Sequence, residues 1–283
     1  MFRTTMVAAM LLAATPAIAQ TGARVEVSGI EMYYEVSGDG PPLIVLHGAY
    51  MNIPTMGQII PDLAETNTVY ALELQGHGRT TDIDRPITYE NLAEDVVGFM
   101  DAVGIDKASL FGYSMGANTA LRFAIDHPER VQRAVLASVA YDLTGWQPAY
   151  QAFLPQLTPE MFVGTPMEDE YRRLAANPEG FAALVDKLIA LEHLPLAWEA
   201  DVASMETPLL IIQGDADTVT LEHSVQLFQL LGGGVMGDLG EPLPASRLAI
   251  LPATSHTALI NQPELLKALI EPFLRDEAPK AAF

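Results

Sequence analysis

The chain has 283 residues, 49 % of them apolar, which is enough to bury a full core in one large domain or two small ones. Fifteen Lys and Arg oppose 36 Asp and Glu, giving a formal charge of −21, so the positive surface that binds nucleic acid or an anionic membrane is missing. The chain contains no cysteine, which excludes disulfides, Cys-based metal centres and a thiol nucleophile. Any covalent catalysis must therefore use an oxygen or nitrogen nucleophile.

The first residues have the pattern of an export signal. Arg3 supplies a positive start, residues 6–12 are mostly apolar, and Ala17-Ile18-Ala19 is the small-x-small pattern that precedes cleavage. The alternative is an uncleaved anchor, but the apolar run is shorter than the ~20 residues that span a bilayer. We expect removal of residues 1–19, a periplasmic or secreted protein, and no stable membrane anchor after cleavage.

Short apolar runs predict a largely parallel sheet. Residues 25–36 are β-branched and aromatic around Ser28-Gly29, which predicts an opening hairpin. Continuous apolar runs follow at 43–46, 69–74, 108–111, 133–139, 209–212 and 247–251. Runs without polar alternation are typical of strands buried on both faces. Because helical stretches separate them, we predict an α/β fold with a doubly wound, mostly parallel sheet.

Capping residues and apolar spacing predict the helices. Residues 88–104 begin at a capping Thr88 and end at Gly104. An Ala-rich helix over 115–126 must end before Pro128. Residues 221–231 have helical spacing, and residues 259–273 are expected to form one closing amphipathic helix.

Residues 141–205 interrupt the alternation of strands and helices. This segment has several prolines, helical spacing over 181–191 and both tryptophans of the chain, Trp146 and Trp198. We predict an inserted helical cap between a first core part, 20–140, and a second, 206–283. Its aromatic residues either close the core of the cap or line a substrate pocket, for which Tyr50, Trp146 and Trp198 are the candidates.

The central motif is Gly112-Tyr113-Ser114-Met115-Gly116, a G-x-S-x-G between a predicted strand and a predicted helix. A serine on such a turn projects its hydroxyl above the sheet, and the glycines leave room for the neighbouring strand and helix. The hydroxyl becomes a nucleophile only when an imidazole removes its proton and a carboxylate orients that imidazole. Downstream, Asp217 and His256 each follow a predicted strand, in the order Ser114, Asp217, His256.

The chain resembles the α/β-hydrolase superfamily of esterases, lactonases and carbon–carbon hydrolases. The resemblance covers nearly the whole chain after residue 19 and is carried by the serine motif, His47-Gly48, residues 76–80 (GHGRT) and residues 127–131 (HPERV). It implies Ser114 as nucleophile, His256 as general base and then acid, Asp217 as orienting carboxylate, and the N–H groups of Ala49 and Met115 as oxyanion hole.

Two other carboxylates compete for the acid position. Asp215 lies two residues before Asp217, and the pattern of the family, Gly followed after two residues by Asp, favours Asp217. Some relatives place the acid after an earlier strand, where this chain has Asp142.

The remaining histidines and glycines have simpler interpretations. Five of the histidines are expected to have structural roles. Four of them, His47, His77, His127 and His223, lie in motifs or at helix starts, and His193 lies in the predicted cap. No histidine pair has metal-binding helical spacing, and we expect neither a metal nor a cofactor. The G-x-G-x-x-G at 232–237 follows a helix rather than a strand, so it predicts a loop and not a dinucleotide site.

A serine nucleophile with a histidine base indicates acyl transfer to water. We predict a carboxylic ester hydrolase that acts on a small to medium, fairly hydrophobic small-molecule substrate. The alternatives on the same triad are a lactonase, a carbon–carbon hydrolase and a cofactor-free perhydrolase. A non-catalytic binding protein of this fold is a further alternative, but its mark would be a lost triad member. The sequence does not determine the oligomeric state.

Overall fold

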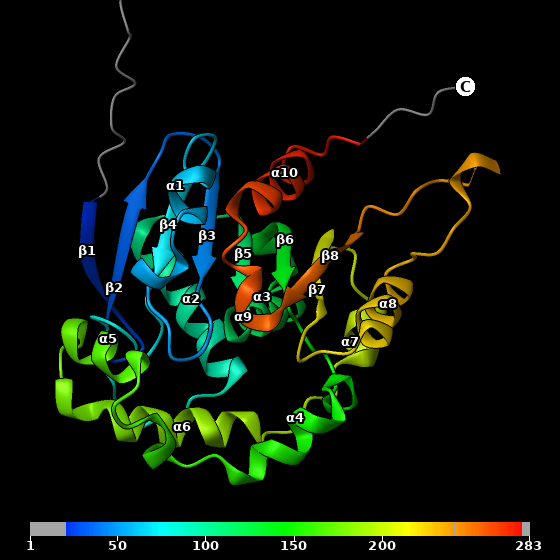
Figure 1. Ribbon diagram of the computed structural model, residues 1–283. Helices are drawn as coiled ribbons and strands as arrows, with labels where there is room; N and C mark the ends of the chain where they lie inside the picture. The colour runs from blue at the N-terminus through cyan, green and yellow to red at the C-terminus, as the bar shows by residue number, and fades with distance from the viewer. Residues whose placement is uncertain (1–20, 240, 279–283) are drawn as a thin grey trace, which may run out of the picture.

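The computed structural model describes residues 21–239 and 241–278, so the predicted export signal lies outside the described residues. The described residues form an eight-stranded sheet in the order β1-β2-β4-β3-β5-β6-β7-β8 (Figure 1). β2 pairs antiparallel with β1 and β4, and the other pairs are parallel. The strands are β1 (Thr21–Val27), β2 (Ile30–Ser37), β3 (Pro42–Leu46), β4 (Thr68–Leu72), β5 (Ala108–Tyr113), β6 (Val131–Ala137), β7 (Leu209–Ala216) and β8 (Arg247–Ser255). The predicted fold class and opening hairpin are confirmed.

Helices cover both faces of the sheet, which explains the unbroken apolar runs of its strands. In β3, Leu43 and Val45 join the core against α1 (Ile59–Leu63) and α10 (Pro263–Leu274). Ile44 and Leu46 join the opposite core, against α2 (Tyr89–Val103), α3 (Met115–Asp126) and α8 (Leu221–Leu230). Alternate side chains of one strand thus fill two separate layers of packing.

Local signals set the helix ends. The Thr88 hydroxyl accepts a hydrogen bond from the Asn91 N–H at 3.1 Å, and Gly104 ends α2 with a left-handed φ of 76°. The predicted closing helix over 259–273 is present as α10, but it begins at Pro263 rather than Leu259, after the short helix α9 (His256–Leu259). Pro263 opens α10, and a residue before proline is disfavoured in helical conformation, so the helices separate at Gln262 although the leucine spacing continues.

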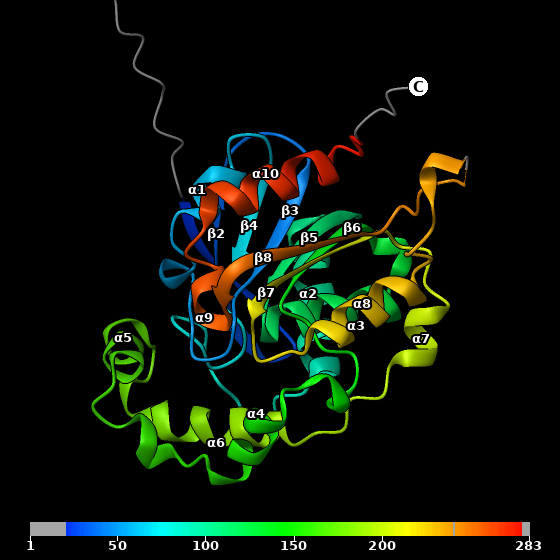
Figure 2. The same ribbon diagram turned by 45° about the vertical axis from the view of Figure 1, so that its right-hand side comes forward.

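The segment between β6 and β7 is helical. It contains α4 (Pro148–Phe153), α5 (Pro166–Leu174), α6 (Phe181–Glu192) and α7 (Glu199–Ala203). Helices α4 to α6 lie beyond the carboxyl ends of the parallel strands, at the bottom of Figures 1 and 2. The two ends of this segment lie side by side. Asp142 and Ala197 form an isolated antiparallel bridge, and the Trp198 N–H donates to the Tyr141 carbonyl at 3.0 Å.

Short 3-10 turns connect these elements. They are η1 (Pro54–Met56), η2 (Pro128–Arg130), η3 (Leu143–Gly145), η4 (Leu154–Gln156), η5 (Pro159–Phe162), η6 (Pro178–Gly180) and η7 (Gly237–Leu239). Among the described residues, none of the helices has the length and apolar character needed to cross a membrane.

Candidate active site

The turn between β5 and α3 holds Ser114 in a strained backbone conformation. Its φ is 55° and its ψ is −119°, a region that residues with a side chain rarely adopt. A Cβ at Gly112 would lie 2.2 Å from the Gly116 carbonyl oxygen. A Cβ at Gly116 would lie 2.2 Å from the Leu46 carbonyl oxygen. Both positions therefore need glycine, because only then can β5, α3 and β3 approach closely enough to hold Ser114 at the sheet edge.

Three residues predicted from the sequence meet at this edge. The Nε2 atom of His256 lies 3.0 Å from the Ser114 hydroxyl, and its Nδ1 atom lies 2.8 Å from Oδ1 of Asp217. An ionised carboxylate can only accept hydrogen bonds, so Nδ1 carries the imidazole proton and Nε2 offers a lone pair to the Ser114 O–H. This is the geometry of a base that can remove a proton from a serine.

Asp217 is buried among hydrogen-bond donors. Besides His256, its Oδ1 atom accepts from the Ser138 hydroxyl at 2.8 Å and from the Thr218 N–H at 2.6 Å. Burial raises the pKa of a carboxyl, but here the hydrogen bonds from His256, Ser138 and Thr218 outweigh burial and hold the Asp217 pKa below its ordinary value. The carboxylate therefore stays ionised beside His256 at neutral pH.

Ser138 is a residue of this site that was not predicted from the sequence. This residue follows β6, which is the neighbour of β7 in the sheet, and it has a left-handed φ of 60°. Its hydroxyl lies 2.8 Å from the His256 Nδ1 atom as well as from Asp217. The sequence does place a small polar residue, Ser138, at the end of the strand β6. That β6 lies beside β7, the strand that precedes Asp217, is known only from the strand order of the structure.

The two competing carboxylates have other partners. Asp215 accepts from the Ala253 N–H at 2.8 Å and from the Thr254 N–H at 3.0 Å, so it fixes the segment before His256. Asp142 accepts from the Thr144 N–H at 2.7 Å at the start of η3. Of the three carboxylates considered, the structure brings Asp217 to the imidazole.

The loop after β3 presents the Ala49 N–H, one of the two expected oxyanion-hole donors. The His47 Nε2 atom accepts from the Leu74 N–H at 3.1 Å, so Nδ1 donates to the Gly48 carbonyl at 2.8 Å. Burial lowers the pKa of His47, which keeps the ring neutral. Because the Gly48 carbonyl and the Ala49 N–H belong to one planar peptide, this contact also fixes the direction of the Ala49 N–H.

The second expected donor is the N–H of Met115. Met115 is the first residue of α3, where backbone N–H groups have no acceptor within the helix. The positive end of the helix dipole adds to the attraction for a negative oxygen beside Ser114.

Comparisons with known proteins agree with this geometry. Residues 41–197 match the alpha/beta hydrolase fold family. The chain belongs to this family. A 2-hydroxymuconate semialdehyde hydrolase of Pseudomonas sp. (strain CF600) is 27 % identical over 222 residues, covering 71 % of this chain and 78 % of that protein. A pimeloyl-[acyl-carrier protein] methyl ester esterase of Aeromonas hydrophila is 26 % identical over 269 residues, covering 84 % and 96 %.

The structural comparison supports the same fold. The carboxylesterase CesB of Bacillus subtilis superposes with a TM-score of 0.72 at 20 % identity, covering 92 % of this chain and 93 % of that chain. The protein is thus a hydrolase of the alpha/beta fold, as predicted from the serine motif and its context.

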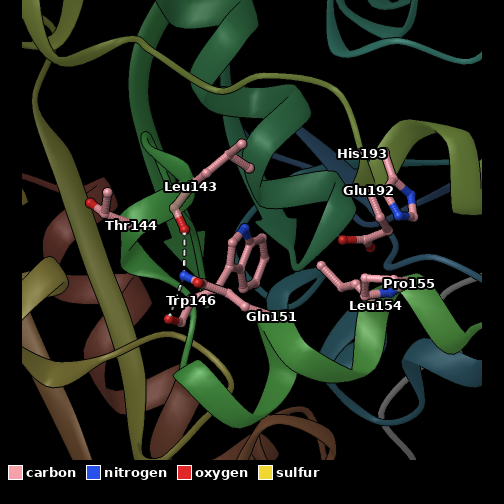
Figure 3. A pocket seen from close by; sticks show the side chains of 8 residues that line it. All are labelled: Leu143, Thr144, Trp146, Gln151, Leu154, Pro155, Glu192 and His193. Atoms are coloured by element: carbon pink, nitrogen blue, oxygen red, sulfur yellow. Dashed lines mark hydrogen bonds between the residues drawn. The ribbon is translucent and has the colours of Figure 1, made fainter.

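Residues of the cap segment line two hollows of this hydrolase. One, of about 390 Å³, is lined by Asp217 and His256 together with Tyr150 and Phe153 of α4. The other, of about 320 Å³, is lined by Trp146, Leu154, Glu192 and other residues of the segment 143–193 (Figure 3). Trp146 lines the second hollow and Tyr150 the first, and the centroids of these two rings lie 5.3 Å apart.

The three predicted pocket residues lie in different surroundings. Trp146 lines the second hollow, and its buried indole Nε1 has no partner among the described residues. Tyr50, which has a left-handed φ of 62°, follows Ala49 and stacks on Phe162 of the cap at 4.7 Å. Trp198 instead packs edge-on against Tyr89 at 5.6 Å, in the core, and lines neither of these two hollows.

The other histidines of the hydrolase make structural contacts. Burial lowers the pKa of His77 to about 3 and that of His223 to about 4. His127 contacts Glu94 at 2.9 Å, and His193 contacts the Ile189 carbonyl at 2.7 Å. Within residues 21–239 and 241–278, no group of three His, Asp or Glu could hold a metal ion. The glycine-rich segment 232–237 follows α8, without the preceding strand that a dinucleotide site needs.

Proposed function

We propose that this hydrolase cleaves carboxylic esters through an acyl-enzyme formed on Ser114. The observation that carries the proposal is the continuous chain of contacts from Ser114 through His256 to Asp217, at 3.0 and 2.8 Å. The names of two relatives, a methyl ester esterase and a carboxylesterase, support an ester as the substrate class.

The proposed reaction proceeds in two halves. Ser114 Oγ attacks the ester carbonyl carbon while its proton passes to His256 Nε2, and the N–H groups of Ala49 and Met115 stabilise the oxyanion. His256 then gives this proton to the departing alcohol, which leaves an acyl group on Ser114. A water molecule loses a proton to the same imidazole and attacks the acyl carbon. The carboxylic acid leaves as Ser114 takes the proton back.

The cap indicates the size and polarity of the substrate. The hollow beside Asp217 and His256 measures about 390 Å³, and the second hollow about 320 Å³. Trp146, Leu154 and Phe153 give these walls apolar surface. A small or medium ester with a hydrophobic group matches this space better than a long polymer does.

The decisive experiment measures hydrolysis of aryl esters of increasing acyl length and of simple lactones, by wild type and by Ser114→Ala in parallel. We expect ester turnover, with a loss of several orders of magnitude in the variant and a residual acceleration of roughly 10³–10⁴ over water. Unchanged turnover in Ser114→Ala would exclude the serine mechanism.

The panel also separates the alternatives on the same triad. Lactone turnover well above ester turnover would replace the proposal by a lactonase. Turnover of a vinylogous diketone alone would replace it by a carbon–carbon hydrolase, and turnover of none of these compounds would favour a binding role.

We also propose that the protein is exported. The support is the charge, apolar and small-residue pattern of residues 1–19. Mass determination of the mature protein from its native host tests this, because cleavage after Ala19 leaves Gln20 as the first residue.

A further inference from the structure

Glu192 of α6 is a carboxylate that the proposed reaction does not use. It is partly buried and lines the second hollow of the cap, where Figure 3 shows its carboxylate on the side opposite Trp146. The Tyr150 hydroxyl donates a hydrogen bond to it. None of the ion pairs among the described residues involves Glu192, which is unusual for a carboxylate held away from water.

Aromatic side chains surround this carboxylate. Tyr150 contacts it directly, the Trp146 ring lies 5.3 Å from that of Tyr150, and Tyr50 and Tyr89 lie within its electrostatic reach. Aromatic faces and a carboxylate both attract cations, and the attraction is strongest where water is excluded. The formal charge of −21 also raises the local concentration of positively charged small molecules.

Glu192 interacts with residues of the first hollow. Tyr150, which hydrogen-bonds Glu192, also lines the first hollow with His256 and Asp217. Glu192 is close enough to His256 for the two charges to interact. Glu192 therefore lies within electrostatic reach of the imidazole that contacts Ser114.

We propose that Glu192 is a specificity-determining residue that binds a positively charged ammonium group of the ester substrate against Trp146 and Tyr150. This inference rests on the proposed esterase function for its reaction, but the binding of the cation can be measured separately. It names a substrate class, esters with an ammonium group a few bonds from the ester oxygen.

The test uses two esters of nearly the same shape. Butyrylcholine carries a permanent trimethylammonium group, and 3,3-dimethylbutyl butyrate has carbon in place of the nitrogen. We expect wild type to favour the cation in kcat/KM by about tenfold, and Glu192→Gln to remove most of that preference. Glu179→Gln is the matched control, because it removes one exposed carboxylate of the cap that pairs with Arg172 on the surface.

The ratio of the two rates also reports the charge of Glu192. Burial raises the Glu192 pKa to about 6, against the opposing effects of His256, Tyr150 and His193, so the preference for the cation should fall as the pH drops through this value. Tyr50 and Tyr89, which also face Glu192, stay neutral in this range because their own pKa values are raised.

A binding measurement separates this inference from the proposed function. Ser114→Ala should bind butyrylcholine by titration calorimetry, and Ser114→Ala with Glu192→Gln should bind it about tenfold more weakly. Equal binding by the two variants, or an unchanged rate ratio in Glu192→Gln, would overturn the role of Glu192. Binding that depends on Glu192 in a protein that hydrolyses neither ester would support the cation site and reject the esterase.

Discussion

Asp217 and Glu192 are two carboxylates near one active site, and their surroundings give them opposite properties. Asp217 accepts hydrogen bonds from His256, Ser138 and Thr218, which hold its pKa below the ordinary value despite burial. Glu192 has one hydroxyl donor, Tyr150, and burial raises its pKa to about 6. The donors oppose burial more strongly at Asp217 than at Glu192, so the two pKa values shift in opposite directions.

This difference fits the two roles. Asp217 can orient an imidazole because its Oδ1 atom accepts several hydrogen bonds from the protein, although its buried Oδ2 atom has no partner among the described residues. A carboxylate with a single donor gains most from a positive ligand, because the ligand supplies the stabilisation that the protein does not.

The largest expected effect is a difference in kcat between variants of the two carboxylates. Asp217→Asn should lower kcat by about 10⁴, because an amide no longer fixes the tautomer of His256. Glu192→Gln should keep more than about a tenth of kcat on a neutral ester, because a neutral substrate makes no ion pair there. Steady-state kinetics on a neutral aryl ester measure both.

Asp215→Asn is the matched control for Asp217→Asn. Asp215 accepts two backbone N–H groups, so its loss should lower the free energy of unfolding and change kcat little. If Asp215→Asn lost as much activity as Asp217→Asn, the assignment of the orienting acid would be wrong.

A smaller effect is expected from removing one donor of Asp217. Ser138→Ala deletes the hydroxyl 2.8 Å from Oδ1 of Asp217 without changing the Cβ that the left-handed backbone already accommodates. We expect kcat/KM to fall about tenfold, equivalent to about 1.4 kcal/mol. A variant as active as wild type would show that the other donors suffice.

The pH dependence of stability should have opposite signs at the two sites. The Asp217 pKa is lowered on folding, so its contribution is complete above the unfolded value and is lost as the pH falls through the folded value. The Glu192 pKa is raised to about 6, so its contribution is complete below the unfolded value and is lost as the pH rises through 6.

Denaturant unfolding of wild type and Glu192→Gln between pH 4 and pH 7 measures how the contribution of Glu192 to the free energy of unfolding depends on pH. Wild type should lose about 1–2 kcal/mol relative to the variant as the pH rises. Parallel stability curves would mean that the Glu192 carboxylate titrates as it does in water.

The smallest expected effect is a change in the Glu192 pKa when its hydroxyl donor, Tyr150, is removed. Tyr150→Phe removes the hydroxyl that lowers the Glu192 pKa, so this pKa should rise. The midpoint of the cation preference would move to higher pH by the same amount. A midpoint that stays in place would show that Tyr150 does not stabilise the charged form.

The sequence predicted the sheet and the residues that meet at Ser114, because each follows from a local pattern. Gly112 and Gly116 mark the turn, and Asp217 and His256 follow apolar runs whose carboxyl ends share one sheet edge. Ser138 and Glu192 were missed because their roles depend on contacts with residues far along the chain. The break between α9 and α10 was missed because apolar spacing outweighed the signal of Pro263.

The closure of the cap on itself has an evolutionary consequence. The segment between residues 142 and 197 leaves the core and returns to it at one point, where the bridge between Asp142 and Ala197 joins its ends. Since the ends are already paired, a replacement segment of another length incurs only a slowly growing entropic cost of closure. Exchange of this segment as a cassette can therefore create new specificities while β5, β7 and β8 keep the same chemistry.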